Sequence, residues 1–220
     1  MGVEFKRAIR FIESHGIILV FPINNRREPS SLWYQFFPRT EMRWEWDETG
    51  QDGVAALWHL RTELSVSSRV VYTKWYRGRA TFFSKSVFTA MLTLLRSSSS
   101  TRTGLGEDAS RILEILRSDS PLSTKVIKQL SDLQGRFHEA SYQRAMKELW
   151  NRLFIVAFGE VEDSSFPSLA VGATNLLFEE LWDESRGLSQ AKAEEIITRA
   201  LPAKSPFLKY FSGIRKGLEL

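Results

Sequence analysis

The residues with the clearest capacity for chemistry lie between Glu63 and Glu107, where forty-three consecutive positions contain no acidic side chain. This stretch contains the cations Arg69, Lys74, Arg77, Arg79, Lys85, Arg96 and Arg102. Interspersed among them are the aromatic residues Tyr72, Trp75, Tyr76, Phe82, Phe83 and Phe88. A surface of one sign of charge that also carries flat rings suits a polyanion with stackable bases, which favours nucleic acid. The alternative interpretation is that the aromatic residues form core and the cations only solubilise the protein.

Within this stretch, Arg77-Gly78-Arg79 lies between two β-like runs, residues 70–75 and 80–83, and is typical of a hairpin tip. Two guanidinium groups beside a glycine can clamp phosphates or approach a narrow groove closely. We therefore predict that this hairpin is the main nucleic-acid contact. The predicted contact residues of this half of the chain are Arg69, Lys74, Arg77, Arg79 and Lys85.

Signals for catalysis are weak in this sequence. Its histidines are scattered, and no glycine-rich phosphate loop or G-x-S-x-G motif is present. Glu45 and Asp47 lie beside Trp44 and Trp46, and an acid next to stacking rings could activate water at an extruded base. Such a cluster is also typical of an exposed turn. Asp47 and Glu45 are therefore weak catalytic candidates, and we expect no metal site and no cofactor.

Composition places the chain among globular proteins and excludes several classes of site. It has 220 residues, of which 43% are hydrophobic and 12% aromatic, with a net charge of +4 and a pI of about 9.4. Residues 1–106 hold 15 basic and 9 acidic residues, and residues 107–220 hold 15 and 17, so the positive field lies in the first half. The absence of cysteine excludes a disulfide scaffold, a thiolate zinc site and a cysteine nucleophile.

Targeting signals are also missing from the sequence. The first residues include Lys6, Arg7 and Arg10, which do not fit a secretory hydrophobic region. The longest apolar run, residues 17–23, is interrupted by Pro22 and is far shorter than the roughly 20 residues that span a bilayer. We expect a soluble cytoplasmic protein with no membrane partner.

A short polar segment divides the chain. Residues 97–106, SSSSTRTGLG, form the best candidate linker because they combine serine, threonine and glycine. The segment separates an N-terminal unit, residues 1–96, from a second unit, residues 107–172. Residues 173–220 follow as a helical C-terminal segment.

The second unit has the pattern of a winged helix-turn-helix. Three helical segments are followed by a two-stranded ribbon, and the third helix has a polar face that carries Arg144 and Lys147. Arginine suits guanine edges and lysine suits phosphates, so both are predicted DNA contacts. The ribbon tip, from Gly159 to Asp163, is acidic and would be repelled by phosphate. Taken alone, this unit therefore favours a structural or protein-binding role.

Five short motifs follow one another between residues 21 and 84, and the likeness they carry runs through most of residues 10–180. They are Phe21-Pro22-Ile23, Ser31-Leu32-Trp33, Trp44-x-Trp46-Asp47, Tyr72-x-Lys74 and Ala80-Thr81-Phe82-x-Ser84. In this order they resemble the bacterial winged-helix proteins related to the AlkZ/YcaQ DNA glycosylases. The resemblance implies tandem winged-helix units that form a basic concave surface for duplex DNA, in DNA repair or maintenance. The glycosylases use a Gln-x-Gln motif to position water, and no two glutamines of this chain have that spacing. The chain is also shorter than those enzymes.

We therefore expect an α+β protein of tandem winged helix-turn-helix modules with C-terminal helices, the first module carrying the basic hairpin. It would bind double-stranded DNA with little or no catalysis. One alternative is a DNA glycosylase that acts on damaged bases. The other is a winged-helix scaffold for a protein partner or a homodimer, which the aromatic group Trp33, Tyr34, Phe36 and Phe37 would favour.

Overall fold

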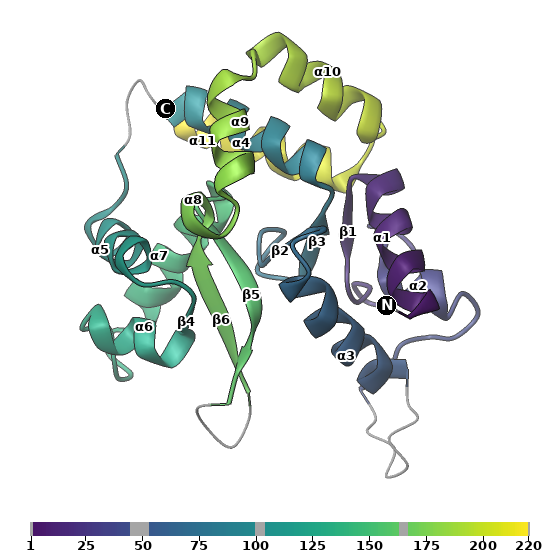
Figure 1. Ribbon diagram of the computed structural model, residues 1–220, viewed down its shortest axis with the longest axis horizontal. Helices are drawn as coiled ribbons and strands as arrows, with labels where there is room; N and C mark the ends of the chain where they lie inside the picture. Colours follow the sequence, from purple (N-terminus) through teal and green to yellow (C-terminus); the bar gives the residue numbers. More distant parts are fainter. Residues whose placement is uncertain (1, 45–52, 100–103, 163–166, 220) are drawn as a thin grey trace.

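A computed structural model describes residues 2–44, 53–99, 104–162 and 167–219. It confirms the α+β class: helices surround one six-stranded antiparallel sheet of order β1-β3-β2-β5-β6-β4 (Figure 1). The strands are β1 (Ile17–Leu19), β2 (Val71–Thr73), β3 (Thr81–Phe83), β4 (Leu122–Ser123), β5 (Ile155–Val161) and β6 (Ser168–Ala173).

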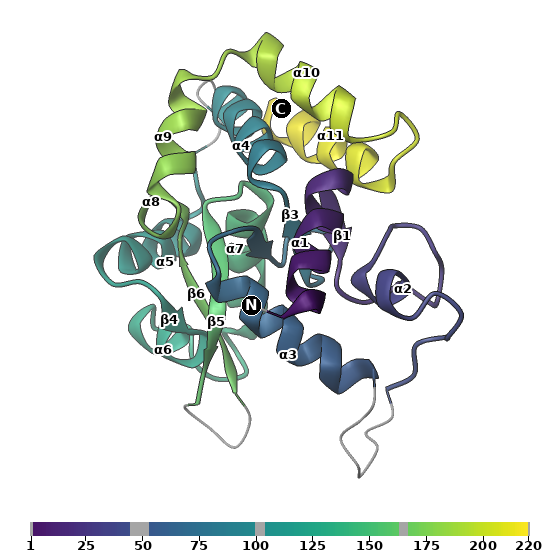
Figure 2. The ribbon, with the colours of Figure 1, turned by 45° about the vertical axis from the view of Figure 1, so that its right-hand side comes forward.

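The helices fall into three groups around this sheet (Figures 1 and 2). The first group is α1 (Val3–His15), α2 (Leu32–Phe36) and α3 (Gly53–Val66). The second group is α5 (Glu107–Ser118), α6 (Thr124–Leu130) and α7 (Glu139–Asn151). The third group is α4 (Lys85–Ser99), α8 (Thr174–Leu177), α9 (Glu179–Gly187), α10 (Gln190–Ala200) and α11 (Pro206–Glu219).

The first two groups repeat one order of elements. In the N-terminal half the order is α1-β1-α2-α3-β2-β3, and in the following half it is α5-β4-α6-α7-β5-β6. In each half the first strand pairs antiparallel with the third, β1 with β3 and β4 with β6. The halves meet where β2 pairs with β5, with Tyr72 opposite Ala157. From either edge of the sheet, the strands therefore follow in the order first, third and second strand of a half.

Strands β1, β2 and β3 are buried on both faces, which explains why their side chains are mostly apolar. Successive side chains of a strand point to opposite faces. Ile18 and Tyr72 accordingly join one core with α1, α3, α5 and α7, whereas Ile17 and Val71 join a second core with α4, α9, α10 and α11. The C-terminal helices thus share their core with α4 and not only with one another.

Two helices begin at serine residues whose hydroxyls cap the first turn. The hydroxyl of Ser84 accepts the Val87 amide at 3.4 Å, and that of Ser123 accepts the Val126 amide at 3.2 Å. The predicted linker is different. Helix α4 continues to Ser99, so the first three residues of the segment 97–106 are helical. The apolar face of α4, buried against the C-terminal helices, carries the helix past the serine-rich composition that indicated a loop.

Candidate nucleic-acid interface

The predicted basic hairpin is present. Strands β2 and β3 pair from Val71 with Phe83 to Thr73 with Thr81, and Arg77-Gly78 lies in the turn between them. Arg77 has a φ of +53° and Gly78 a φ of +72°, a left-handed conformation that glycine adopts without steric cost. The turn therefore exposes the side chains of Arg77 and Arg79 to solvent.

The aromatic residues of the same stretch are packed in the cores of the protein. All six rings predicted as possible stacking platforms are buried, and each is at most 3% exposed. Tyr72 and Phe82 pack in one core, and Trp75 and Phe83 in the other. The prediction of an exposed stacking surface was wrong. The rings on β2 and β3, the two that follow β2 and the one on α4 are all packed in a core. In this stretch the predicted nucleic-acid contacts that reach the surface are cations and not aromatic rings.

Helix α7 has the two faces that its sequence predicts. Its apolar positions are all buried: Tyr142, Ala145, Met146, Leu149 and Trp150. Arg144 and Lys147 are exposed on the other side. The guanidinium of Arg144 donates only to groups of its own helix, the Ala140 carbonyl and the Ser141 hydroxyl. The polar face therefore keeps both cations available.

The hairpin and α7 face each other across two adjoining cavities of about 860 and 680 Å³, which we call the basic groove. Helix α11 closes the third side. The two cavities share Arg77, Lys147, Asn151 and Tyr210 in their lining, so they form one surface. The cations that line the groove are Lys74, Arg77, Arg144, Lys147, Arg152 and Lys209. Two sequence signals that lie some seventy residues apart thus converge on one place.

The electrostatic balance of the groove is positive. Of its six cations, Arg152 alone forms an ion pair with a carboxylate of the described residues, that of Glu148. Among those residues, Glu148 is the one acidic group in the lining. Its carboxylate lies 3.2 Å from the Arg152 guanidinium and accepts the Gly106 amide at 3.3 Å, so its charge is already compensated. The groove therefore presents free positive charge to a polyanion.

Tyr210 of α11 holds the hairpin against α7. Its hydroxyl donates to the Asn151 side-chain oxygen at 3.0 Å, and its ring packs edge-on against Trp75 and Tyr76 at centroid distances of 5.0 and 5.1 Å. Burial raises the pKa of Tyr210, and a hydrogen bond with the Arg77 backbone partly offsets that rise. Sequence reasoning missed both Tyr210 and Lys209, because nothing in the pattern of α11 indicates which elements it touches.

We expect Tyr210→Phe to lower the free energy of unfolding by about 1 kcal/mol, the usual net worth of a neutral hydrogen bond. The variant keeps the ring contacts with Trp75 and Tyr76, so the loss reports on the hydroxyl alone. Urea unfolding followed by tryptophan fluorescence measures it. An unchanged unfolding midpoint would show that the hydroxyl does not brace the hairpin.

The other predicted contacts lie outside the groove. Arg79 is exposed beyond Gly78 but lines neither cavity, and Arg69 is exposed before β2, at the end of the strand away from the hairpin tip. Lys85, at the start of α4, pairs with Glu180 of α9. The catalytic candidates Glu45 and Asp47 lie outside the described residues.

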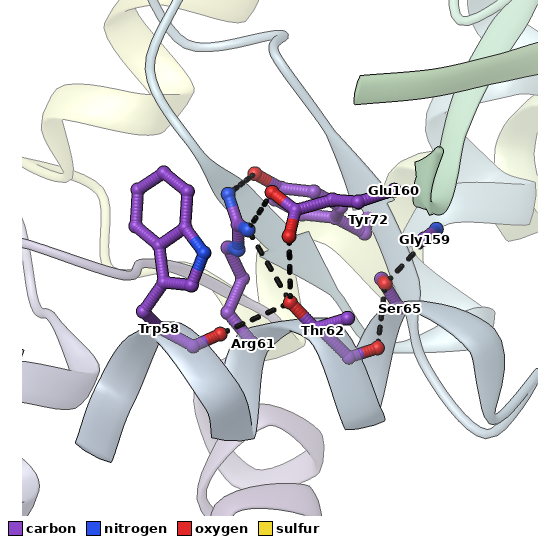
Figure 3. A network of polar contacts seen from close by, with 7 residues as sticks. All are labelled: Trp58, Arg61, Thr62, Ser65, Tyr72, Gly159 and Glu160. Atoms are coloured by element: carbon purple, nitrogen blue, oxygen red, sulfur yellow. Dashed lines mark hydrogen bonds and ion pairs between the residues drawn. The ribbon is translucent and has the colours of Figure 1, made fainter. Parts of the chain in front are cut away.

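Glu160 of the acidic ribbon tip is not the free negative charge that the sequence indicates. β5 extends to Val161, so Glu160 belongs to the strand, and its carboxylate pairs with the buried Arg61 of α3 (Figure 3). The Thr62 hydroxyl donates to the same carboxylate at 3.4 Å, and the Gly159 amide donates to the Ser65 hydroxyl at 3.1 Å. The argument that Glu160 would repel phosphate was therefore wrong, because a cation of the first half neutralises it.

Arg61 has further partners that hold it in place. Its guanidinium lies 3.9 Å from the centre of the Trp58 ring and 3.5 Å from the Tyr72 hydroxyl (Figure 3). Burial raises the pKa of Tyr72, and the Arg61 charge opposes that rise. An arginine held between rings and a carboxylate is suited to a buried interface.

The two interfaces between the repeated halves are thus unequal. On one side, the third helix of the first half, α3, meets the ribbon of the second half and is closed by Arg61 and Glu160. On the other side, the third helix of the second half, α7, faces the hairpin of the first half across the basic groove. The interface between α3 and the ribbon is therefore closed by an ion pair of the chain itself. The equivalent interface between α7 and the hairpin is open and lined by cations.

Metal and membrane features give no competing site in the described part of the chain. No group of three or more histidine, aspartate or glutamate side chains there could hold a metal ion. None of the helices described has both the length and the apolar character needed to cross a bilayer.

Comparison with known proteins identifies the family. The family model described as AlkZ related matches residues 3–207, most of the chain. The chain belongs to the AlkZ-related family. This relates it to the AlkZ/YcaQ DNA glycosylases, and so to DNA repair, as the five motifs indicated. No curated protein and no solved structure matches this AlkZ-related chain.

Proposed function

We propose that this chain is a DNA-binding protein of tandem winged-helix type that binds duplex DNA at the basic groove, in DNA repair or maintenance, with little or no catalysis. The observation that carries the proposal is the convergence of the hairpin and α7 on one groove, in which every lining cation except Arg152 lacks an acidic partner among the described residues. The relation to the AlkZ/YcaQ glycosylases supports the setting. The absence of a Gln-x-Gln motif supports the restricted catalysis.

The topology supports the winged-helix interpretation of both halves. A winged helix has the order helix, strand, helix, helix and two-stranded wing, and its third helix enters the major groove by the N-terminal part. Both repeated halves have this order, and their first strand pairs with the third. In the second half, the C-terminal end of α7 is occupied by the contact between Asn151 and Tyr210. Arg144, nearer the N-terminal part, is exposed and suited to reach DNA.

Lys74 gives the proposed binding a pH dependence. Burial, followed by the positive charge of Arg61, lowers the pKa of Lys74, and Glu160 opposes the shift. Lys74 therefore loses its proton at a lower pH than an ordinary lysine does. DNA affinity should fall as the pH rises through this lowered pKa.

The variant Lys74→Arg tests this dependence, because arginine keeps its charge throughout the range. Anisotropy of a labelled duplex, measured from about pH 7 to about pH 9.5, should show a decline for the wild type that is reduced in Lys74→Arg. Equal declines would show that Lys74 does not contribute its charge to binding.

The first test of the proposal is direct. A labelled duplex is titrated with the full chain at low salt, and the molar mass of the protein alone is measured by light scattering after size exclusion. Salt-sensitive binding of the duplex supports the proposal, because phosphate contacts release counterions. A chain that ignores DNA and elutes as a dimer would instead support the protein-interaction scaffold.

Base excision is a second candidate function, favoured by the family relation. It predicts that the full chain releases damaged bases and that Asp47→Asn or Glu45→Gln abolishes release but preserves DNA binding. Gel analysis of alkylated duplex after strand cleavage at abasic sites measures this activity. Equal release by the wild type and both variants would exclude these two carboxylates as the catalytic groups.

A further inference from the structure

The smaller cavity of the basic groove has aromatic walls. Its volume of about 680 Å³ lies within the range of small-molecule sites. Trp75, Tyr142, Trp150 and Tyr210 line it, together with the apolar side chains of Met146 and Leu169. These four aromatic residues come from the hairpin, α7 and α11, three elements far apart in sequence. Such walls suit a flat apolar ring more than a hydrated chain.

Two residues that line this cavity each carry a hydrogen-bonding group without a partner among the described residues. The indole Nε1–H of Trp75 and the hydroxyl of Tyr142 are both buried and make no hydrogen bond. Buried polar groups in folded proteins are normally paired, so each such exception calls for an explanation. Burial raises the pKa of Tyr142, and the charge of Glu139 adds to the rise, so the hydroxyl keeps its proton and can donate.

Amide groups at the cavity complete a polar edge. The Gln143 nitrogen donates to Glu139 at 2.8 Å, which leaves its carbonyl oxygen as an acceptor. The Asn151 oxygen accepts from Tyr210, which leaves its amide nitrogen as a donor. Side-chain amides of this kind pair with the edges of nucleobases. The cavity therefore offers both donors and acceptors beside its aromatic walls.

The rim of the cavity is cationic. Lys74, Arg77 and Lys147 line it, and no acidic residue of the described chain does. An uncharged aromatic ligand would not need this rim, whereas a nucleotide within a DNA strand carries a phosphate on each side of its base. Proteins bind unpaired nucleotides with aromatic side chains on which the bases stack and with a positively charged groove that follows the nucleic-acid backbone.

We propose that this cavity binds one unpaired nucleobase of a DNA strand, whose flanking phosphates contact Lys74, Arg77 and Lys147. Trp75 Nε1–H and the Tyr142 hydroxyl donate to the base, and the aromatic walls enclose it. The inference rests on the proposed DNA binding and deepens it: the preferred ligand is duplex DNA with an unpaired base.

The test compares two labelled duplexes of equal sequence, one of which carries a single extra unpaired thymine. We expect the full chain to bind the bulged duplex at least about ten-fold more tightly, given what base stacking contributes. Permanganate oxidises an exposed unpaired thymine, so the bound bulge should become protected. Tyr142→Phe keeps the ring and loses an unpartnered hydroxyl, and should reduce the preference by about five-fold.

A matched control variant and two measurements, duplex affinity and thymine protection, distinguish the outcomes. Tyr34→Phe removes a hydroxyl that bonds the Asn25 carbonyl outside the groove, and should leave the preference unchanged. If both duplexes bind equally and the thymine stays reactive, the base-binding inference is overturned while DNA binding stands. An equal preference in wild type and Tyr142→Phe, with the thymine unprotected, also overturns it. If neither duplex binds, the proposed function fails as well.

Discussion

The double variant Arg144→Glu/Lys147→Glu is expected to bind duplex DNA at least about 100-fold more weakly than the wild type. Each charge-assisted hydrogen bond to a phosphate contributes about 1.5–3 kcal/mol, and about 1.4 kcal/mol corresponds to a ten-fold change in affinity. Both side chains are exposed on α7 and pair with no carboxylate, so their loss leaves the fold intact. Anisotropy of a labelled duplex at constant salt measures the effect.

The matched control is Lys6→Glu/Arg10→Glu on the exposed side of α1. It changes the net charge by the same amount, but neither residue lines the basic groove. We expect this control to lose only a small part of the affinity, through the weaker long-range field. Equal losses in the two double variants would mean that net charge, and not the groove, determines binding.

The variant Glu160→Gln is expected to lower the free energy of unfolding by about 3–5 kcal/mol. Arg61 and Glu160 have side chains only 6% and 14% exposed, and removal of one partner leaves an uncompensated buried charge. Glutamine has the same shape, so the loss reports on the charge. A typical domain has a stability of only about 5–15 kcal/mol, which makes this a large fraction. Urea unfolding at neutral pH measures the change.

Two comparisons identify the cause of that loss. Glu195→Gln removes a carboxylate that pairs with Lys192 and Arg199 on the surface of α10, and should leave the unfolding midpoint almost unchanged. The double variant Arg61→Met/Glu160→Leu removes both charges and should recover much of the stability, because apolar groups of similar volume often replace a buried pair. If Glu160→Gln were as stable as the wild type, the pair would not hold the two halves together.

Local features of the fold could be predicted from the sequence. The hairpin around Gly78, the caps at Ser84 and Ser123 and the two faces of α7 depend on neighbours in sequence, and the structure contains all of them. Where burial depends on both faces of the sheet, sequence reasoning was wrong. The six aromatic residues of the basic stretch belong to the two cores, because α1 and α3 cover one face of the hairpin, and α4 and the C-terminal helices cover the other.

Long-range contacts account for the parts of the site that the sequence did not indicate. Glu160 has the pattern of an acidic tip until Arg61, ninety-nine residues earlier, is brought against it. Lys209 and Tyr210 come from a helix whose role could not be predicted, because its partners, the hairpin and α7, are distant in sequence. The cations Lys74, Arg77, Arg144 and Lys147 were predicted individually, but their convergence on one groove required the antiparallel joining of β2 and β5.

The measurement that tests the central claim most directly is duplex binding across a salt series, with the wild type beside Arg77→Ala/Arg79→Ala. The logarithm of the binding constant should fall linearly with the logarithm of salt concentration, with a slope of about −0.9 for each phosphate contact. If the hairpin binds the DNA backbone, the double variant should bind more weakly and its slope should be shallower by about two. An unchanged slope would show that DNA is bound elsewhere, and no binding by the wild type at low salt would contradict the assignment of the groove to DNA.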